Sequence, residues 1–102
     1  MNELGRDKLR AAALAGVPQI KEKLYWGAGR CAIGVLTDVG ETWNENENIH
    51  QRLDLVGISS YPGPERSYVC SLCDRGFKAE ALLIIHLNDD HELDFLAIAN
   101  KL

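Results

Sequence analysis

Four residues in the C-terminal third of the chain have the side chains and the spacing of a metal site. They are Cys70, Cys73, His86 and His91. Two residues separate the cysteines, twelve separate Cys73 from His86, and four separate the histidines. This is the ligand spacing of a four-coordinate Cys2His2 site, and thiolates with imidazoles suit tetrahedral Zn²⁺ better than a hard cation. The sequence therefore predicts one structural zinc ion bound by these four side chains.

The same spacing predicts the elements that position the ligands. A two-residue gap lets a tight turn aim both thiolates at one point, and the twelve-residue gap leaves room for a short strand followed by a helix. His86 and His91 are five residues apart, about one and a half helical turns. They can share a face only if the helix tightens or loosens near its end. Tyr68, Phe77 and Leu83 occupy the positions where such a ββα unit needs its three core residues.

On these residues the segment 68–91 resembles a Cys2His2 zinc finger. In DNA-binding members of that family three helix positions contact bases, and the corresponding residues here are Ala79, Leu82 and Ile85. None of these side chains can form a hydrogen bond with a base edge, which readout of the major groove requires. The helix is apolar on nearly every side, a pattern typical of a buried helix. We therefore expect Leu82 and Ile85 to be largely buried, either in the chain's own core or in an interface.

Charge separates the candidate functions. Residues 61–102 carry four basic groups against seven acidic ones, a net charge of −3, whereas a DNA-binding surface is usually basic. We therefore expect a protein–protein interaction or regulatory module, whose partner is another protein or a second copy of the chain. Residues 1–30 carry six basic groups against three acidic ones. The alternative is nucleic-acid binding through this segment, by Arg6, Lys8 and Arg10, with the finger as a scaffold.

An enzyme is not expected from this sequence. Four protein ligands leave the zinc no open position for water, and catalytic zinc sites keep one. The chain contains no deaminase signature, nucleophile elbow or phosphate-binding loop. Glu92, beside His91, either orients the imidazole or has no role. Cys31 lies in an apolar run and is expected to be a small buried hydrophobic residue. Trp26, Trp43 and Tyr61 are expected to be packing anchors, with an exposed Trp at an interface as the alternative.

Length and composition indicate a folded soluble protein with a modest core. The chain has 102 residues, a net charge of −4 and 46% apolar residues, so a metal ion would contribute usefully to its stability. No apolar run is long enough to cross a membrane, and the N-terminus lacks the apolar core of a signal peptide. An odd cysteine beside a thiolate–zinc site is typical of a reducing compartment, so we expect the cytoplasm.

Capping residues and apolar patterns predict the other elements. Three helices are expected to start at a capping residue: one from Asn2 to about Ala15, one over 49–56 after Asn48, and one from Asp94 to Leu102. A fourth helix is expected over 31–39, with a stop at Gly40. The run 31–39 is ambiguous between helix and strand, and helix is favoured because Ala32, Val35, Leu36 and Val39 fall on one face. Residues 24–26 fit a helical turn or a short strand. Residues 41–48 form a polar loop around Trp43.

These elements predict an α+β fold, a small and mostly helical zinc-stabilised domain in which a ββα-like finger segment packs on N-terminal helices. We expect an N-terminal helical segment over 1–58, a linker over 59–67 that is rich in turn-forming residues, and the finger segment with its closing helix over 68–102. The three parts are expected to form one compact unit.

A second resemblance covers more of the chain. Its pieces are Gly29-Arg-Cys-Ala-Ile-Gly34, Trp43-Asn44, the Cys-x2-Cys pair, and His86-Leu-Asn-Asp-Asp-His91 followed by a short helix. Together they look like small uncharacterised proteins of actinobacteria and their phages. That group brings no activity with it. The resemblance implies a bacterial or phage origin and a zinc site that lies between two helices rather than in a free-standing finger.

Overall fold

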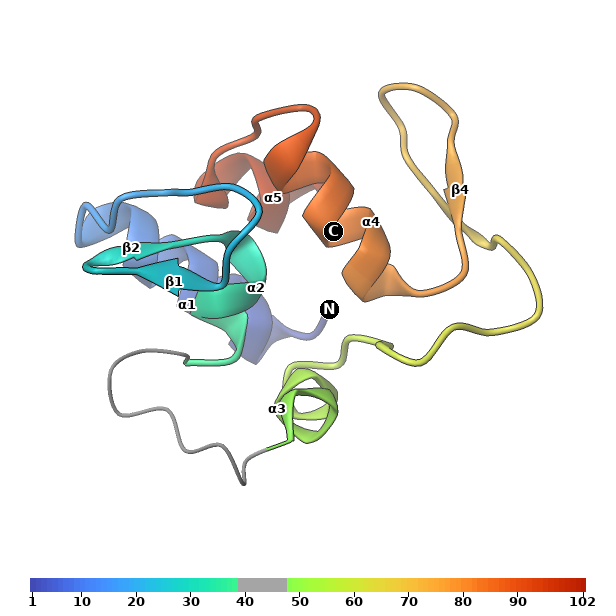
Figure 1. Cartoon of the computed structure of the whole chain (residues 1–102), viewed down its shortest axis with the longest axis horizontal. Helices are drawn as coiled ribbons and strands as arrows, with labels where there is room; N and C mark the ends of the chain where they lie inside the picture. Colours follow the sequence, from blue (N-terminus) through green and yellow to red (C-terminus); the bar gives the residue numbers. More distant parts are fainter. Residues whose placement is uncertain (39–47) are drawn as a thin grey trace.

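The computed structural model describes residues 1–38 and 48–102, in which it has five helices and two antiparallel hairpins (Figure 1). The helices are α1 (Glu3–Leu14), α2 (Ala32–Leu36), α3 (Ile49–Leu55), α4 (Glu80–Asp89) and α5 (Phe95–Lys101). The hairpins pair β1 (Tyr25–Trp26) with β2 (Gly29–Arg30), and β3 (Tyr68–Val69) with β4 (Gly76–Phe77). The predicted mixed α+β class is confirmed. None of these helices is long and apolar enough to cross a bilayer.

Three helices begin at the predicted caps. The side chains of Asn2, Asn48 and Asp94 each accept a hydrogen bond from a backbone N–H in the first turn of α1, α3 and α5, at 3.1, 2.9 and 2.7 Å. Such bonds satisfy donors that have no partner inside the helix. The short polar residue before each apolar run therefore fixes where the helix starts.

The ambiguous run 31–39 is helical, but its helix is shorter than predicted. α2 ends at Leu36, and Asp38 has a φ of +55°, a left-handed conformation that stops a helix and that Asp tolerates better than most residues. The predicted stop at Gly40, the residue Val39 and all but the last residue of the predicted loop 41–48 lie outside the described residues. Tyr25–Trp26 forms a strand, so the strand alternative for 24–26 is confirmed.

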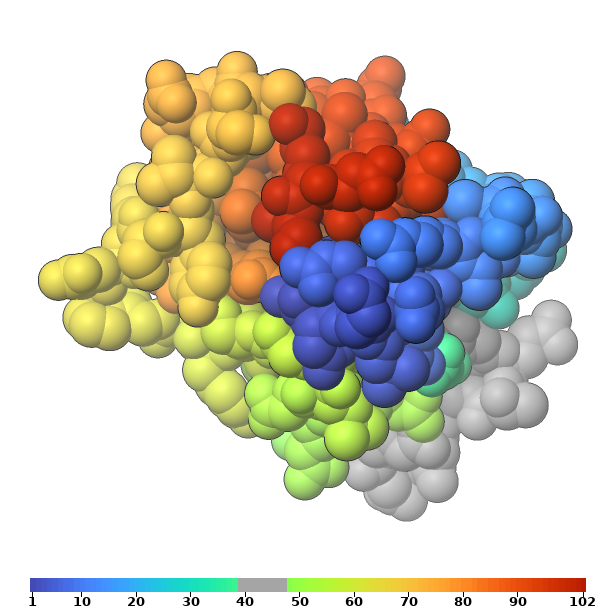
Figure 2. Space-filling view, turned by 180° about the vertical axis from the view of Figure 1, so that it is seen from behind, coloured from blue at the N-terminus to red at the C-terminus, as the bar shows by residue number. Residues whose placement is uncertain are grey.

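One hydrophobic cluster runs through the N-terminal and C-terminal parts of the chain. α1 packs against α2 and α5, while α4 packs against α2, α5 and both strands of the β3–β4 hairpin. Figure 2 shows α5, in red, lying on the N-terminal segment, in blue. Fully buried side chains from several elements meet in this cluster: Leu9, Leu36, Val56, Ile58, Ile84, Leu87 and Ile98. Of the N-terminal helices, α2 therefore packs on α4 and α1 packs on the closing helix α5, whereas the division at 59–67 stays a prediction.

Ser59, the first residue of the predicted linker, caps the finger helix. Its Oγ accepts a hydrogen bond from the Glu80 N–H at 3.0 Å, and its carbonyl oxygen accepts one from the Ala81 N–H at 3.0 Å. Ala79, at the N-cap of α4, makes no side-chain cap. Ser59 satisfies two N–H groups that would otherwise lack partners, and it ties the chain before the hairpin to the helix after it.

Asn88 ties the finger helix to the N-terminal part. Its side chain is 2% exposed. The Oδ1 atom accepts hydrogen bonds from the Ala32 N–H at 3.0 Å and from Gln19 Nε2 at 2.8 Å, and Nδ2 donates to the Ile20 carbonyl at 2.9 Å. A buried amide that fulfils its hydrogen bonds in this way fixes the position of α4 relative to α2. Asn88 was not among the residues predicted from the sequence.

Candidate metal centre

The four predicted ligands converge on one point. Their ligand atoms all lie within 4.8 Å of one another. Cys70 Sγ is 3.4 Å from His91 Nε2, and Cys73 Sγ is 3.3 Å from His86 Nε2. In a tetrahedral site with Zn–S of about 2.3 Å and Zn–N of about 2.0–2.1 Å, sulfur and nitrogen ligands lie about 3.5 Å apart. The group can therefore hold a metal ion, and its geometry and donor set are compatible with zinc.

The turn of the β3–β4 hairpin positions the two cysteines. The hairpin register pairs Tyr68 with Phe77. Beyond the strands, the Cys70 N–H donates to the Arg75 carbonyl and the Asp74 N–H donates to the Cys70 carbonyl, both at 2.8 Å. Asp74 has a φ of +61°, which reverses the chain directly after Cys73. The two-residue gap thus forms the tight turn that the spacing predicts, and both sulfurs face the histidines.

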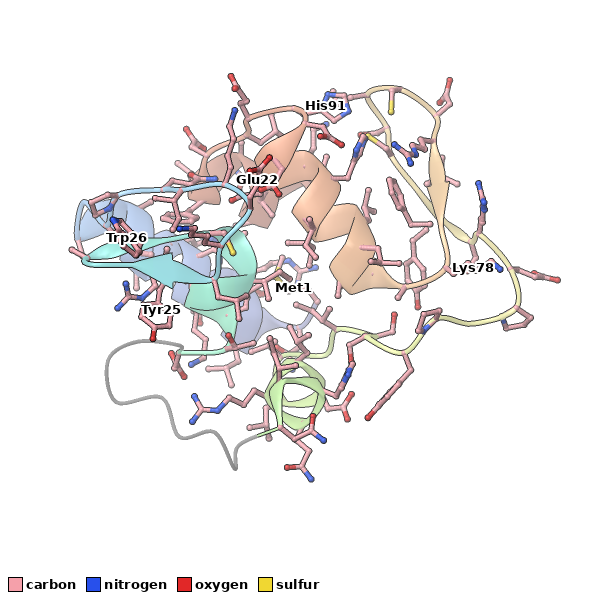
Figure 3. The ribbon with its side chains drawn as sticks, viewed as in Figure 1. Met1, Glu22, Tyr25, Trp26, Lys78 and His91 are labelled. Atoms are coloured by element: carbon pink, nitrogen blue, oxygen red, sulfur yellow. The ribbon has the colours of Figure 1, made fainter. Side chains whose placement is uncertain are left out.

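The end of α4 positions the two histidines. The carbonyl of His86 accepts hydrogen bonds from the N–H groups of Asp90, at 2.9 Å, and His91, at 3.3 Å. The second of these bonds spans five residues, so the helix loosens at its end, one of the two ways predicted for the histidines to share a face. Their rings meet edge to face with centroids 4.6 Å apart. Figure 3 shows His91 where the loop after α4 approaches the hairpin turn.

Asp90 orients one of the ligands. Its Oδ2 lies 2.7 Å from His86 Nδ1, so that Nε2 of the same ring faces the cysteines. A carboxylate on the outer nitrogen of a ligating histidine fixes the ring and raises its basicity. Asp90 was not among the predicted site residues, although a carboxylate four residues after a helical histidine is a usable signal. Glu92 does not orient His91, because its carboxylate pairs with Lys21, which lowers the pKa of Glu92.

The two cysteines differ in exposure. Cys70 is buried, whereas Cys73 is exposed. Burial raises the pKa of the Cys70 thiol, but hydrogen bonds from the Leu72 and Cys73 backbone, the Cys73 side chain and the charge of Lys101 together lower it below its ordinary value. The thiolate is the form that binds metals. The hairpin turn therefore favours the ligating form of the buried sulfur.

The predicted core of the ββα unit is present. Leu83 is buried, and Tyr68 and Phe77 are half-buried against the hydrophobic cluster. The Phe77 ring lies 4.9 Å from the His86 ring, between centroids. These contacts pack the hairpin against the ligand-bearing side of α4.

The outer side of α4 contradicts one of the two predicted locations of Leu82 and Ile85, the chain's own core, whereas their burial in an interface stays a prediction. Ala79 is fully buried, but Leu82 and Ile85 are 41% and 42% exposed, so they do not lie in the chain's own core. α2, α5 and the β3–β4 hairpin cover the side of the helix that carries Leu83 and Ile84. The apolar character of α4 on nearly every side therefore does not mean that every side is buried within this chain.

The predicted burial is confirmed for Cys31 but not for Trp26 and Tyr61. Cys31 is buried as predicted, and burial raises the pKa of its thiol. Its Sγ also accepts a hydrogen bond from the Gly34 N–H at 3.4 Å, which makes it the cap of α2. Trp26 is 71% exposed and Tyr61 is 65% exposed. Neither residue anchors the core of the described chain, although the Tyr61 ring stacks on the His50 ring with centroids 4.0 Å apart. The third predicted anchor, Trp43, lies outside the described residues.

Comparison with known proteins gives no relative on which to base a function. No family model matches the chain, and neither a curated protein nor a solved structure is significantly similar to it. The resemblance to a zinc finger therefore rests on the ligand geometry and the hairpin–helix arrangement. The resemblance to actinobacterial and phage proteins has no support from these comparisons.

Proposed function

We propose that the chain is a small protein–protein interaction or regulatory module, and that a structural zinc ion holds its binding surface in place. Two cysteines and two histidines would fill all four positions of a tetrahedral zinc ion, which is typical of structural rather than catalytic sites. Thiolate ligands also suit a reducing compartment such as the cytoplasm. Elemental analysis of protein purified without added metal tests the zinc, and one ion per chain is the expected result.

The observation that carries the proposal is an apolar ridge on α4, formed by Leu82 and Ile85. Both side chains point outward at about two-fifths exposure although the rest of the helix is well packed. Neither side chain can form a hydrogen bond with a base edge. Two outward apolar residues one helical turn apart match the pattern by which a helix contacts a protein surface.

The surroundings of the α4 ridge support the same reading. Ile85 also lines a largely apolar cavity of about 170 Å³ together with Leu24, Cys31 and Ile33. Pockets beside exposed apolar residues are where the anchoring side chains of a partner are usually buried. The α4 ridge and this cavity thus form one surface that a partner protein, or a second copy of the chain, can cover.

The test compares two double variants. The tagged zinc-loaded protein is used to capture partners from a nuclease-treated cell extract. The α4 ridge variant Leu82→Ser/Ile85→Ser should lose the captured protein. The control Leu14→Ser/Leu55→Ser, which changes side chains that are 90% and 69% exposed elsewhere, should retain it. Equal capture by both variants would rule out the α4 ridge as the contact.

The alternative, nucleic-acid binding through the N-terminal segment, has less support. Arg6 bonds to the Leu102 carbonyl, Lys8 pairs with Asp38, and Arg10 lies 3.1 and 3.3 Å from carboxylates on its own helix. Phosphates would have to compete with these contacts. Tight duplex binding at physiological salt, lost when Arg6, Lys8 and Arg10 are changed to Glu, would favour the alternative.

A further inference from the structure

A basic hollow of about 360 Å³ lies beside the β3–β4 hairpin. The residues that line it include Pro62, Arg66, Arg75, Phe77, Lys78 and Leu82. Three of the four basic residues between positions 61 and 102 therefore face one depression. Figure 3 shows Lys78 at the outer edge of the molecule, where β4 leads into α4. Although this part of the chain is acidic in composition, its structure concentrates positive charge at one place.

The hairpin brings these cations together because Gly76 has no side chain. A Cβ atom at Gly76 would lie 2.9 Å from the Arg66 carbonyl oxygen and 3.0 Å from the Arg66 Cβ, distances too short for an unchanged backbone. The segment that carries Arg66 can therefore lie directly on β4. Earlier in the same loop, the Gly63 N–H donates to the Lys78 carbonyl at 2.9 Å. This bond holds the loop before β3 against the end of the hairpin.

None of Arg66, Arg75 and Lys78 forms an ion pair with a carboxylate within residues 1–38 and 48–102. All three are exposed, and the Arg75 guanidinium lies over the Phe77 ring at 5.3 Å from its centroid. On a chain with a net charge of −4, a group of cations in one hollow is a surface complementary to an anionic ligand.

The apolar part of the hollow narrows the class of that ligand. The hollow includes Phe77 and Leu82, and Leu82 also belongs to the α4 ridge. A phosphate backbone would meet the cations but would leave the Phe77 and Leu82 surface without a matching group. An acidic peptide with an apolar side chain uses both parts, since its carboxylates meet the cations while its apolar side chain covers Phe77 and Leu82.

We propose that this basic hollow binds an acidic segment of a partner protein, with carboxylates of Asp or Glu against Arg66, Arg75 and Lys78 and an apolar side chain on Phe77 and Leu82. The inference rests on the proposed protein–protein function and specifies which kind of segment binds. It places the contact at the Leu82 end of the α4 ridge, whereas Ile85 lines the other cavity.

The test selects ligands without assuming a partner. A phage-displayed library of random peptides is panned on the zinc-loaded protein, and the enriched sequences should combine several Asp or Glu residues with one aliphatic or aromatic residue. Binding of labelled synthetic peptides from the selection is then measured by fluorescence anisotropy for the wild type and two charge-reversal variants. Arg66→Glu/Lys78→Glu should weaken binding on the order of tenfold or more. The control Lys21→Glu/Lys23→Glu, with the same change in net charge elsewhere, should have little effect.

Three outcomes would overturn the inference. The first is a selection without enrichment of acidic sequences, and the second is equal binding by the two charge-reversal variants. The third is a labelled single- or double-stranded oligonucleotide that binds more tightly than the peptides and is lost in Arg66→Glu/Lys78→Glu. If the enriched peptides bind Arg66→Glu/Lys78→Glu as tightly as the wild type but do not bind Ile85→Ser, the basic hollow is not the binding site. The proposed contact through the α4 ridge would then still hold. Metal content and circular dichroism verify that each variant is folded.

Discussion

Residues 1–38 and 48–102 form two hairpins of equal size that are held in place by different contacts. Each pairs two residues with two, and isolated two-stranded hairpins are marginal in water. The β1–β2 hairpin is held by hydrogen bonds to neighbouring backbone groups. The Arg30 N–H donates to the Pro18 carbonyl at 2.8 Å, and the Arg30 carbonyl accepts from the Ile20 N–H at 3.0 Å. The Arg30 guanidinium also donates to the carbonyls of Gly27 and Gly29.

The β3–β4 hairpin carries side chains that can bind a metal. Its turn carries Cys70 and Cys73, whose sulfurs face histidines from another element. Its strands contact the core through half-buried Tyr68 and Phe77, and Lys101 Nζ donates to Ser71 Oγ in the turn at 3.0 Å. Because the hydrogen bonds that hold the β1–β2 hairpin involve no metal ligand, that hairpin is expected to stay ordered with or without metal. The other is expected to be ordered only when its ligand set is filled, and the following predictions test that difference.

The largest effect is expected from Cys73→Ser. Metal binding contributes on the order of 10 kcal/mol of apparent free energy in isolated zinc-finger peptides, and a hydroxyl is a poor replacement for a thiolate ligand. We expect residues 68–79 to lose order and α4 to be loosened, because its ligand end is released. Amide hydrogen exchange should show fast exchange in the β3–β4 hairpin and slow exchange retained around Arg30.

Removal of the metal from the unchanged protein provides the control for that prediction. A strong chelator should reproduce the exchange pattern of Cys73→Ser. A thermal melt and an exchange pattern that are both unaffected by the chelator would mean that the protein core holds the β3–β4 hairpin without metal, and the contrast between the hairpins would then be wrong.

Gly34→Ala is expected to disturb the other side of the comparison. A Cβ atom at Gly34 would lie 2.0 Å from the Leu24 carbonyl oxygen, so α2 or the segment leading into β1 must shift. Overpacking of this kind typically costs about 1–3 kcal/mol or more in the free energy of unfolding, and contact with backbone places this case at the upper end. Denaturant unfolding of the zinc-loaded protein measures it, and the metal content should stay at one ion per chain.

Gly27→Ala is the matched control in the turn of the β1–β2 hairpin. No atom lies within 4 Å of a Cβ there, but the φ of Gly27 is +59°. The substitution should therefore cost only about 1–2 kcal/mol of left-handed backbone strain. If Gly34→Ala is no more destabilising than Gly27→Ala, the close approach of Leu24 to α2 does not hold the hairpin.

The sequence predicts the ligands and helix starts because short-range chemistry determines them. Spacing alone identifies Cys70, Cys73, His86 and His91 as a converging set, since two turns of fixed length position them. Capping side chains likewise act within one helical turn, as at Asn2. Each of these features depends on residue types and spacings within one continuous segment of the chain.

Features that depend on packing between distant segments could not be predicted. Asn88 bonds to Gln19 and Ala32 across 69 and 56 positions, and no local pattern distinguishes it from a surface amide. The exposure of Leu82 and Ile85 likewise depends on which side of α4 the other elements cover. An apolar sequence indicates that a surface is buried somewhere, but it does not say whether this chain or a partner covers it.

A smaller effect is expected at the outer shell of the metal site. Asp90→Asn removes the charge that holds His86 Nδ1 at 2.7 Å, and loss of such a partner typically weakens metal binding about 10–100-fold. Competition with a chromophoric chelator measures this. Glu92→Gln is the control, because Glu92 pairs with Lys21 rather than with a ligand. Equal affinities for the two variants would show that the carboxylate of Asp90 does not support the ligand.

The smallest effect concerns Cys31, the thiol that directly follows β2 and lies away from the metal ligands. Burial raises its pKa, so the folded state favours the neutral thiol. A group whose pKa is raised on folding contributes its full stability below its unfolded pKa, about 8.5 for cysteine, and loses that contribution as the pH rises through the folded pKa. The free energy of unfolding should therefore decline at alkaline pH because of this residue.

Cys31→Ser isolates that contribution, because serine does not titrate in this range and is a good helix cap for α2. Unfolding in urea is compared for the zinc-loaded wild type and Cys31→Ser at pH 7.5 and pH 9.5. Any pH dependence of metal binding is common to both proteins and cancels in their difference. We expect the wild type to lose stability relative to the variant at the higher pH. An identical pH dependence would mean that the thiol beside the β1–β2 hairpin ionises as easily in the folded protein as in the unfolded chain. The burial of Cys31 beside the β1–β2 hairpin would then have no effect on the pKa of its thiol.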